Sequence, residues 1–229
     1  MPNIKYVPET PNPKVAIFEI GADLLHPNFS KVVIAKGSKL VDFSPLAQQI
    51  YSRGTDLTRI DFFHSGENQT TISYSRKALA WDERQIVVIK NFQEEFFRRN
   101  EPALMVQALA QNVQAHAPFN HGNHPVKSLV QRSFVAQVNP VLAKDNGAME
   151  LMGVEVRADG QIFADVTMIG ACNGCDSSTM STLRGATKRI NEVLDALKGD
   201  ERYKANPNVQ ALKFMEIRTI EMPDLVLSR

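Results

Sequence analysis

Two cysteines, Cys172 and Cys175, are the residues whose type and spacing most clearly suggest chemistry. They are the only cysteines in the chain of 229 residues, and they form a single C-x-x-C with Asn173 and Gly174 between them. Two cysteines cannot supply the disulfide framework of a small secreted scaffold. The pair is therefore a redox dithiol, half of a metal site, or a chance spacing.

The residues around the pair favour reactive sulfur. Gly170 and Gly174 allow backbone turns that a Cβ would hinder. A helix is predicted to follow, and three hydroxyl residues are candidates for its N-cap: Ser177, Ser178 and Thr179. The positive end of a helix favours the thiolate form of a nearby cysteine. Thiolates bind iron, zinc or copper and attack disulfides, so both a metal site and a redox pair are chemically reasonable.

The number of cysteines in one chain is too small for a complete metal site. Iron–sulfur clusters and structural zinc usually take four protein ligands, and one chain offers two cysteines. The five histidines lie in segments read as solvated loops and are not expected to complete the set: His26, His64, His116, His121 and His124. The simpler route to four ligands is a two-fold axis that brings the C-x-x-C pairs of two chains together.

The helices and strands that form the framework of the protein can also be predicted from the sequence, beginning with the first hundred residues. Runs rich in β-branched residues predict strands at 15–20, 31–35, 58–63 and 70–74, with a turn at 65–68. Ser44 and Pro45 predict the start of a helix over 45–51. Residues 81–98 are ambiguous, but a helix is favoured with five residues on one face: Trp81, Gln85, Val88, Phe92 and Phe96.

The second half of the chain has clearer signals for the ends of helices and strands. A helix is expected over about 129–142, with Gly147 as its left-handed stop. Strands at 149–156 and 161–168 flank an Asp159-Gly160 hairpin turn. A long helix is expected over 177–198, and a last strand over 209–220. The order α-β-β-α-β, with the C-x-x-C loop before the second helix, is that of a two-layer α+β domain.

Length and composition favour two small α+β domains, each with two α/β layers. The expected boundaries are a first domain at 1–99, a helical segment and linker at 100–127, and a second domain at 128–229. The net charge of 26 − 25 = +1 argues against a general nucleic-acid or anionic-membrane binder. The N-terminus shows no secretory signal, and no apolar run approaches the length of a membrane helix. A soluble cytoplasmic protein is expected.

Two motifs resemble those of a known family. The stretch from Gly170 to Thr179, G-A-C-N-G-C-D-S-S-T, is similar to the G-A-C-x-G-C-P-S-S-T motif of the NifU C-terminal domain. Upstream, Asn139-Pro140 and the Asp159-Gly160 hairpin follow that domain's order. In the first half, Thr10-Pro-Asn-Pro13, Ser44-Pro-Leu-Ala47 and Trp81 resemble the N-terminal domain of Nfu-type scaffold proteins.

This resemblance implies an iron–sulfur cluster scaffold or carrier and no enzymatic activity. Cys172 and Cys175 match the family's ligand cysteines. The implied cofactor is a [4Fe-4S] cluster shared by a homodimer, and the implied partners are upstream cluster donors and apo-proteins that receive the cluster. Two departures from the pattern are Asp176, where proline is usual, and Asn146-Gly147-Ala148, where the family has a G-G-D-like stretch. We expect the Asp176 charge to destabilise an anionic cluster slightly.

Two other functions remain open from the residues themselves. One is a dithiol oxidoreductase that uses Cys172 and Cys175, although Ala171 stands where an aromatic residue would be expected before a thioredoxin-like pair. The other is a zinc-bridged dimer with a structural role. No P-loop, dinucleotide-binding or zinc-protease motif accompanies them.

Overall fold

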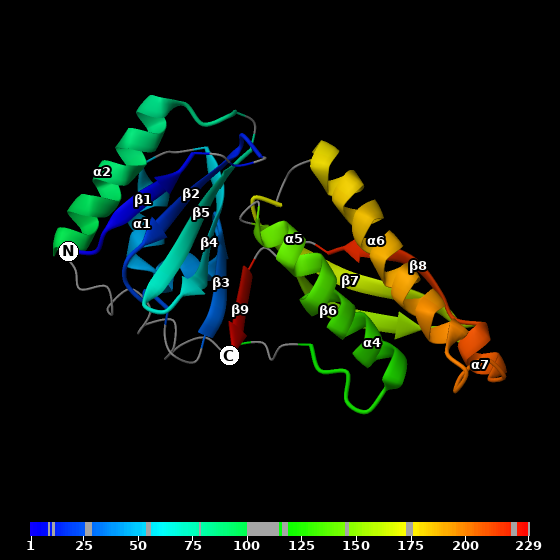
Figure 1. Ribbon diagram of the computed structural model, residues 1–229. Coiled ribbons are helices and arrows are strands. Elements are labelled where there is room, and N and C mark those ends of the chain that lie inside the picture. Colours follow the sequence, from blue (N-terminus) through cyan, green and yellow to red (C-terminus); the bar gives the residue numbers. More distant parts are fainter. Residues whose placement is uncertain are drawn as a thin grey trace. The chain divides into compact units, whose positions relative to one another are not determined.

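The computed structural model has two compact units, each of which folds around its own core (Figure 1). One unit comprises Met1–Pro118 together with Met222–Arg229, and the other comprises Phe119–Glu221. The described residues are 1–8, 10, 12–25, 29–53, 56–77, 79–99, 115, 119–144, 147–172, 176–220 and 224–228. The predicted α+β class with two small domains is confirmed.

The division of the chain differs from the predicted boundaries at its C-terminal end. The second domain was expected to continue to residue 229, but the second unit ends at Glu221. The chain then returns to the first unit, where β9 (Asp224–Ser228) pairs antiparallel with β3 (Phe29–Ala35). Backbone hydrogen bonds to a sheet edge decide this placement, and a short terminal strand gives little local signal of which edge it will join.

The first unit is built on one sheet. Its described strands pair in the order β1-β2-β5-β4-β3-β9, and every pairing is antiparallel. The remaining strands are β1 (Ile4–Val7), β2 (Val15–Ile20), β4 (Leu57–Gly66) and β5 (Gln69–Arg76). The strands predicted at 15–20, 31–35, 58–63 and 70–74 are all present, and β1 and β9 are additional.

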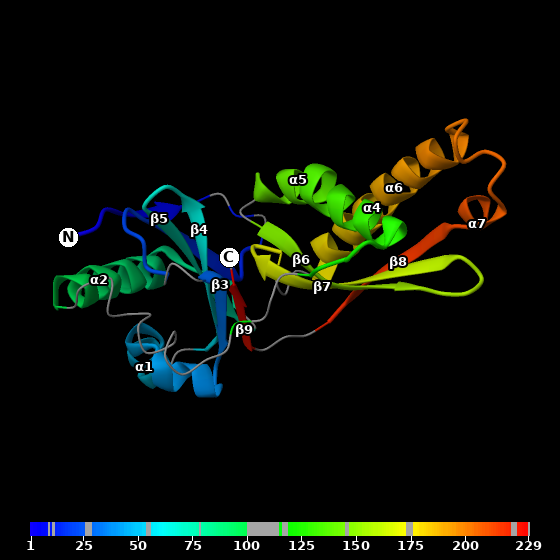
Figure 2. The same ribbon diagram turned by 90° about the horizontal axis from the view of Figure 1, so that it is seen from below.

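Two helices lie on the same side of this sheet, as Figure 2 shows. They are α1 (Pro45–Ser52) and α2 (Glu83–Arg99), and a short 3-10 helix, η1 (Lys39–Phe43), precedes α1. The Ser44 hydroxyl accepts a hydrogen bond from the backbone N–H of Ala47, so the predicted N-cap is confirmed. Both helices bury apolar side chains in a core shared with Phe18, Ile72 and Tyr74.

Helix α2 forms as predicted, but its buried face differs from the expected one. The buried residues are Ile89, Phe92, Gln93, Phe96 and Phe97, which follow the helical spacing of i, i+3, i+4, i+7 and i+8. Val88, which was expected on this face, is 58% exposed. The three phenylalanines at the C-terminal end of α2 set the rotation of the helix, because they have the largest apolar surface to bury.

The second unit places helices on one face of a smaller sheet (Figure 2). Its described strands pair in the order β6-β7-β8. The elements are α4 (Pro125–Ser133), η2 (Phe134–Val138), α5 (Asn139–Ala143), β6 (Gly147–Val156), β7 (Gln161–Gly170), α6 (Asp176–Gly199), α7 (Pro207–Gln210) and β8 (Lys213–Thr219). Strands β6 and β7 form an antiparallel hairpin, whereas β7 and β8 run parallel, with α6 in the connection between them.

The hairpin turn and the buried face of β7 follow the prediction. Gly160, in the turn, has a φ of +85°, which glycine adopts without strain. The side chains predicted to share one face of β7 are all buried in the second core: Ile162, Ala164, Val166 and Met168.

The predicted strand over 209–220 is shorter than expected because a helical turn comes first. Asn206 accepts a hydrogen bond from the Asn208 N–H at 3.0 Å, and Pro207 occupies the first position of α7. Strand β8 then starts only at Lys213. A capping asparagine followed by proline is a helix-start signal that outweighs the apolar residues after it.

Among the helices in the described part of the chain, none is both long enough and apolar enough to cross a membrane.

Candidate metal centre

Cys172 lies just beyond the end of the central strand β7. The strand ends at Gly170, whose φ of +64° turns the chain. Ala171 is buried, and Cys172 is half-buried and packs against the second core. Cys175 falls outside the described residues, and α6 begins immediately after it, at Asp176.

Gly147 leaves the space that the Cys172 side chain occupies. Gly147 is the first residue of β6 and pairs with Gly170 of β7. A Cβ built on Gly147 would overlap the Cys172 sulfur and would lie 3.3 Å from the Cys172 Cβ and 3.2 Å from its backbone nitrogen. Only glycine at position 147 allows the chain after β7 to come this close to the start of β6.

The sequence alone does not indicate this role of Gly147. Gly147 was predicted to end the preceding helix in a left-handed conformation, but it has no positive φ and begins a strand. The prediction as a helix stop is therefore wrong. A glycine at the start of a strand can indicate close approach by another part of the chain, which is the signal that would have found it.

The helix that precedes Gly147 holds the start of β6 in place. The Asn139 side chain accepts a hydrogen bond from the Met149 N–H at 3.0 Å. Asn139 follows the π-helical turn η2, where the expected continuous helix over 129–142 has an i→i+5 hydrogen bond from the Asn139 N–H to the Phe134 carbonyl in place of the α-helical i→i+4 bond. Pro140 lacks the N–H that a regular helix would use, which fits an irregularity at this point. Asn139-Pro140 thus fixes the strand that faces Cys172.

The α6 helix starts one residue earlier than predicted, at Asp176. The helix begins at Asp176, so the residues expected to cap it lie inside its first turn: Ser177, Ser178 and Thr179. The first backbone N–H groups of a helix have no partner within it, and the chain order places Cys175 directly before them. Strand β7 thus ends two residues before Cys172, and α6 begins directly after Cys175, in the order that the sequence predicts.

The histidines have varied surroundings and do not all match the expectation of solvated loops. His64 lies within β4, with Nε2 3.2 Å from the Phe29 carbonyl oxygen and Nδ1 3.4 Å from the Asp23 carboxylate. His124 is exposed and caps α4 by accepting a hydrogen bond from the Lys127 N–H. His121 has a buried Nδ1 that makes no hydrogen bond among the described residues. His26 and His116 lie outside the described part.

No metal-ligating cluster of three or more side chains is found within the described residues, which include Cys172 but not Cys175.

In the first unit, two separate stretches singled out from the sequence come together. Asn12 is buried, and its side chain accepts a hydrogen bond from the Lys14 N–H in a tight turn that leads into β2. The backbone N–H of Trp81 donates to the Pro13 carbonyl at 2.9 Å, and its indole N–H donates to the Lys14 carbonyl at 3.1 Å. Trp81 therefore fastens the segment before α2 to the segment before β2.

Comparison with known families identifies one region of the chain. Residues 130–199 match the NifU-like domain. The match begins in α4, ends with α6 and includes both cysteines and Gly147. It confirms the NifU-like part of the resemblance and indicates a role in iron–sulfur cluster assembly. No curated protein matches the chain.

Proposed function

We propose that this protein is an iron–sulfur cluster scaffold or carrier, a binding and delivery protein rather than an enzyme. The observation that carries the proposal is a C-x-x-C pair inside a NifU-like domain, with Cys172 half-buried at the end of β7 in a space left by Gly147. The pair supplies thiolate sulfur, the usual protein ligand of iron in such clusters.

The cargo in this proposal is a [4Fe-4S] cluster held between two subunits. Four cysteine ligands are typical of such a cluster, and each chain contributes Cys172 and Cys175. Two copies related by a two-fold axis supply the full set. The homodimer is therefore the cluster-bound form.

The position of Cys172 supports the proposal that the cluster is delivered to other proteins. Cys172 retains partial exposure and comes from a short connection between a strand and a helix. Ligands near the surface of a subunit interface can be exchanged for those of an acceptor, whereas a cluster enclosed in one core cannot leave without unfolding it. The partners in this proposal are upstream donors and apo-proteins.

We also propose that the first unit is an Nfu N-terminal-like domain. The support is that Trp81 and Pro13 of the Thr10-Pro-Asn-Pro13 stretch, two parts of the resemblance, are joined by a backbone hydrogen bond, and the Trp81 indole N–H donates to the next residue, Lys14. Because both cysteines lie in the second unit, the first unit acts through surface recognition.

Anaerobic reconstitution with iron and sulfide tests the proposal. The expected product is a brown dimer with about four irons, all lost in Cys175→Ser, whose apo form stays folded by circular dichroism. A colourless protein with stoichiometric zinc would instead establish the zinc-bridged dimer. Catalytic reduction of a disulfide substrate without bound iron would establish the dithiol oxidoreductase.

A further inference from the structure

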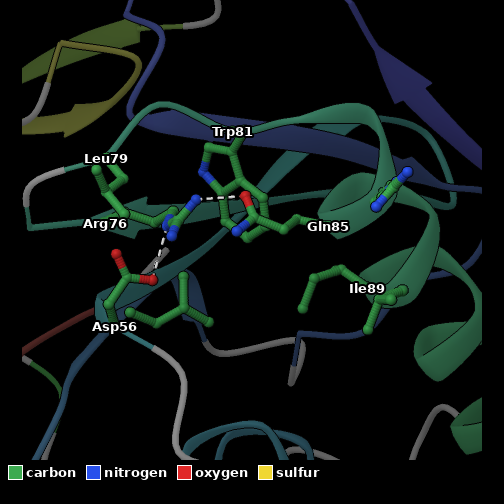
Figure 3. A pocket seen from close by; sticks show the side chains of 9 residues that line it. Asp56, Arg76, Leu79, Trp81, Gln85 and Ile89 are labelled. Carbon is green, nitrogen blue, oxygen red and sulfur yellow. Dashed lines mark hydrogen bonds and ion pairs between the residues drawn. The ribbon is translucent and has the colours of Figure 1, made fainter.

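A pocket of about 460 Å³ opens in the first unit beside the N-terminal half of α2 (Figure 3). This volume lies within the range of roughly 300–1,000 Å³ that is usual for ligand sites. Leu57, Trp81 and Ile89 supply apolar surface, and buried Arg76 and exposed Asp56 supply polar surface. No residue of the cysteine site takes part.

Arg76 is a fixed part of the pocket wall. Its side chain is 6% exposed. Its Nε donates to the Asp56 carboxylate at 2.7 Å, and its Nη1 donates to the Ala80 carbonyl at 2.9 Å and to the Gln85 side-chain oxygen at 2.5 Å. The guanidinium carbon also lies 5.3 Å from the centre of the Trp81 ring. Because Asp56 balances the charge of Arg76, this pair gives the pocket no net charge.

The net charge of the pocket comes from Arg84. This exposed side chain stands at the rim on the first turn of α2, and it makes no ion pair with another residue in the described part of the chain. The pocket therefore carries one uncompensated positive charge. A carboxylate beside Arg84 would complement it.

The two lining residues at the mouth of the pocket, Leu79 and Val88, are apolar and exposed. Leu79 is 62% exposed and Val88 is 58% exposed, although both line the pocket. Val88 is four residues after Arg84, so the two side chains lie on one face of the helix. A ligand confined to the pocket would leave the Leu79 and Val88 side chains in water. An extended segment that continues past the mouth would cover them.

We infer that this pocket binds a segment of a partner protein in which an aliphatic residue is adjacent to an acidic residue. The aliphatic side chain enters between Leu79 and Val88 toward Trp81, and the carboxylate pairs with Arg84. The inference concerns the first unit alone and holds whether or not the cysteines carry a cluster.

Trp81 is the only tryptophan of the chain, so its fluorescence reports directly on the pocket. The probes are three: the blocked pentapeptide Gly-Glu-Leu-Leu-Gly, the same peptide with Gln for Glu, and decanoate. The full-length apo-protein should give a saturable fluorescence change with the acidic peptide. The Gln peptide should bind about threefold more weakly, as expected for one exposed ion pair.

Three variants locate the binding. Arg84→Gln should abolish the preference for the acidic peptide. Val88→Ser should weaken both peptides about fivefold through lost apolar contact. Val87→Ser is the matched control, because Val87 is also exposed, at 53%, but does not line the pocket; it should leave both affinities unchanged.

Three results would overturn the inference. The first is no saturable change with either peptide up to about 1 mM, the weak end of specific binding. The second is equal affinity for the acidic and Gln peptides in the unaltered protein. The third is saturable binding of decanoate alone, which would make this a site for a small amphiphile.

Discussion

The sulfur of Cys172 occupies the position that a side chain on Gly147 would need. The two residues are 25 positions apart in the sequence and are brought together by the β6–β7 hairpin, in which Gly147 pairs with Gly170. The space for this proposed cluster ligand, which lies beyond the end of β7, is thus made by the first residue of β6.

Gly147→Ala should therefore impair cluster loading with little loss of fold. The added methyl overlaps the Cys172 sulfur, so the thiol must move or the strand must shift, at a cost of about 1–3 kcal/mol. We expect a lower melting temperature and less iron per chain after reconstitution, measured by calorimetry and iron assay.

Gly185→Ala is the matched control for that substitution. Gly185 lies within α6, and a Cβ there would meet nothing within 4 Å. This change should raise stability by about 0.5–1 kcal/mol and leave iron content unchanged. Equal iron content in the two alanine variants would contradict the role assigned to Gly147.

Asp176→Asn should make the cluster more persistent while slightly weakening α6. The negative charge follows Cys175 directly and raises the energy of an anionic cluster nearby, whereas at the first position of a helix it favours the helix by about 0.3–1 kcal/mol. The measurement is the rate at which the visible absorbance fades in the presence of an iron chelator. A faster loss of the cluster in the asparagine variant would refute this charge effect.

Removal of residues 222–229 should destabilise the first unit and spare the second. Strand β9 covers the edge of β3 through pairings such as Val32 with Val226 and Val33 with Leu225. Without it, the β3 amides should exchange hydrogen faster, and the unfolding of the first unit, followed through Trp81 fluorescence, should begin at lower denaturant. Amides of β7 serve as the control. Unchanged protection of β3 would show that β9 contributes nothing to this sheet.

The second unit should lose part of its stability in acid through Glu155. Its carboxylate accepts hydrogen bonds from Arg157 at 2.8 Å and from Arg218 at 3.0 Å, and these, Arg157 foremost, hold the pKa of Glu155 below its usual value. A lowered pKa in the folded state means that the stabilisation is present at neutral pH. It is lost as the pH falls below the ordinary glutamate pKa of about 4.3 and through the folded value.

Glu155→Gln tests this dependence. The variant should show slightly weaker hydrogen-exchange protection of β7 and β8 at pH 7 than the unaltered protein, and the two should converge as the pH falls through the folded-state pKa of Glu155. Glu192→Gln is the control, since the Glu192 carboxylate lies 3.9 Å from Lys188 Nζ on the exposed side of α6. A difference that persists in acid would mean that the effect of Glu155 is not electrostatic.

Local patterns in the sequence were sufficient for much of the fold. Ser44-Pro45 identified the start of α1, Asp159-Gly160 identified the hairpin, and the alternation from Ile162 to Met168 identified the buried face of β7. These features depend on neighbours within a few residues, where capping, turn geometry and side-chain alternation decide the outcome. The C-x-x-C and its setting between strand and helix belong to the same class.

Only the tertiary structure decided the relationships between distant residues. The sequence does not show that Gly147 faces Cys172, that β9 returns to β3, or that Val88 is exposed while Ile89, which lines the same pocket, is buried. In each case the outcome is set by which backbones approach and which side chains have the most apolar surface to bury. The sequence by itself determined which chemistry the two thiols could perform, and the packing of β6 against the end of β7 decided where the first of them stands.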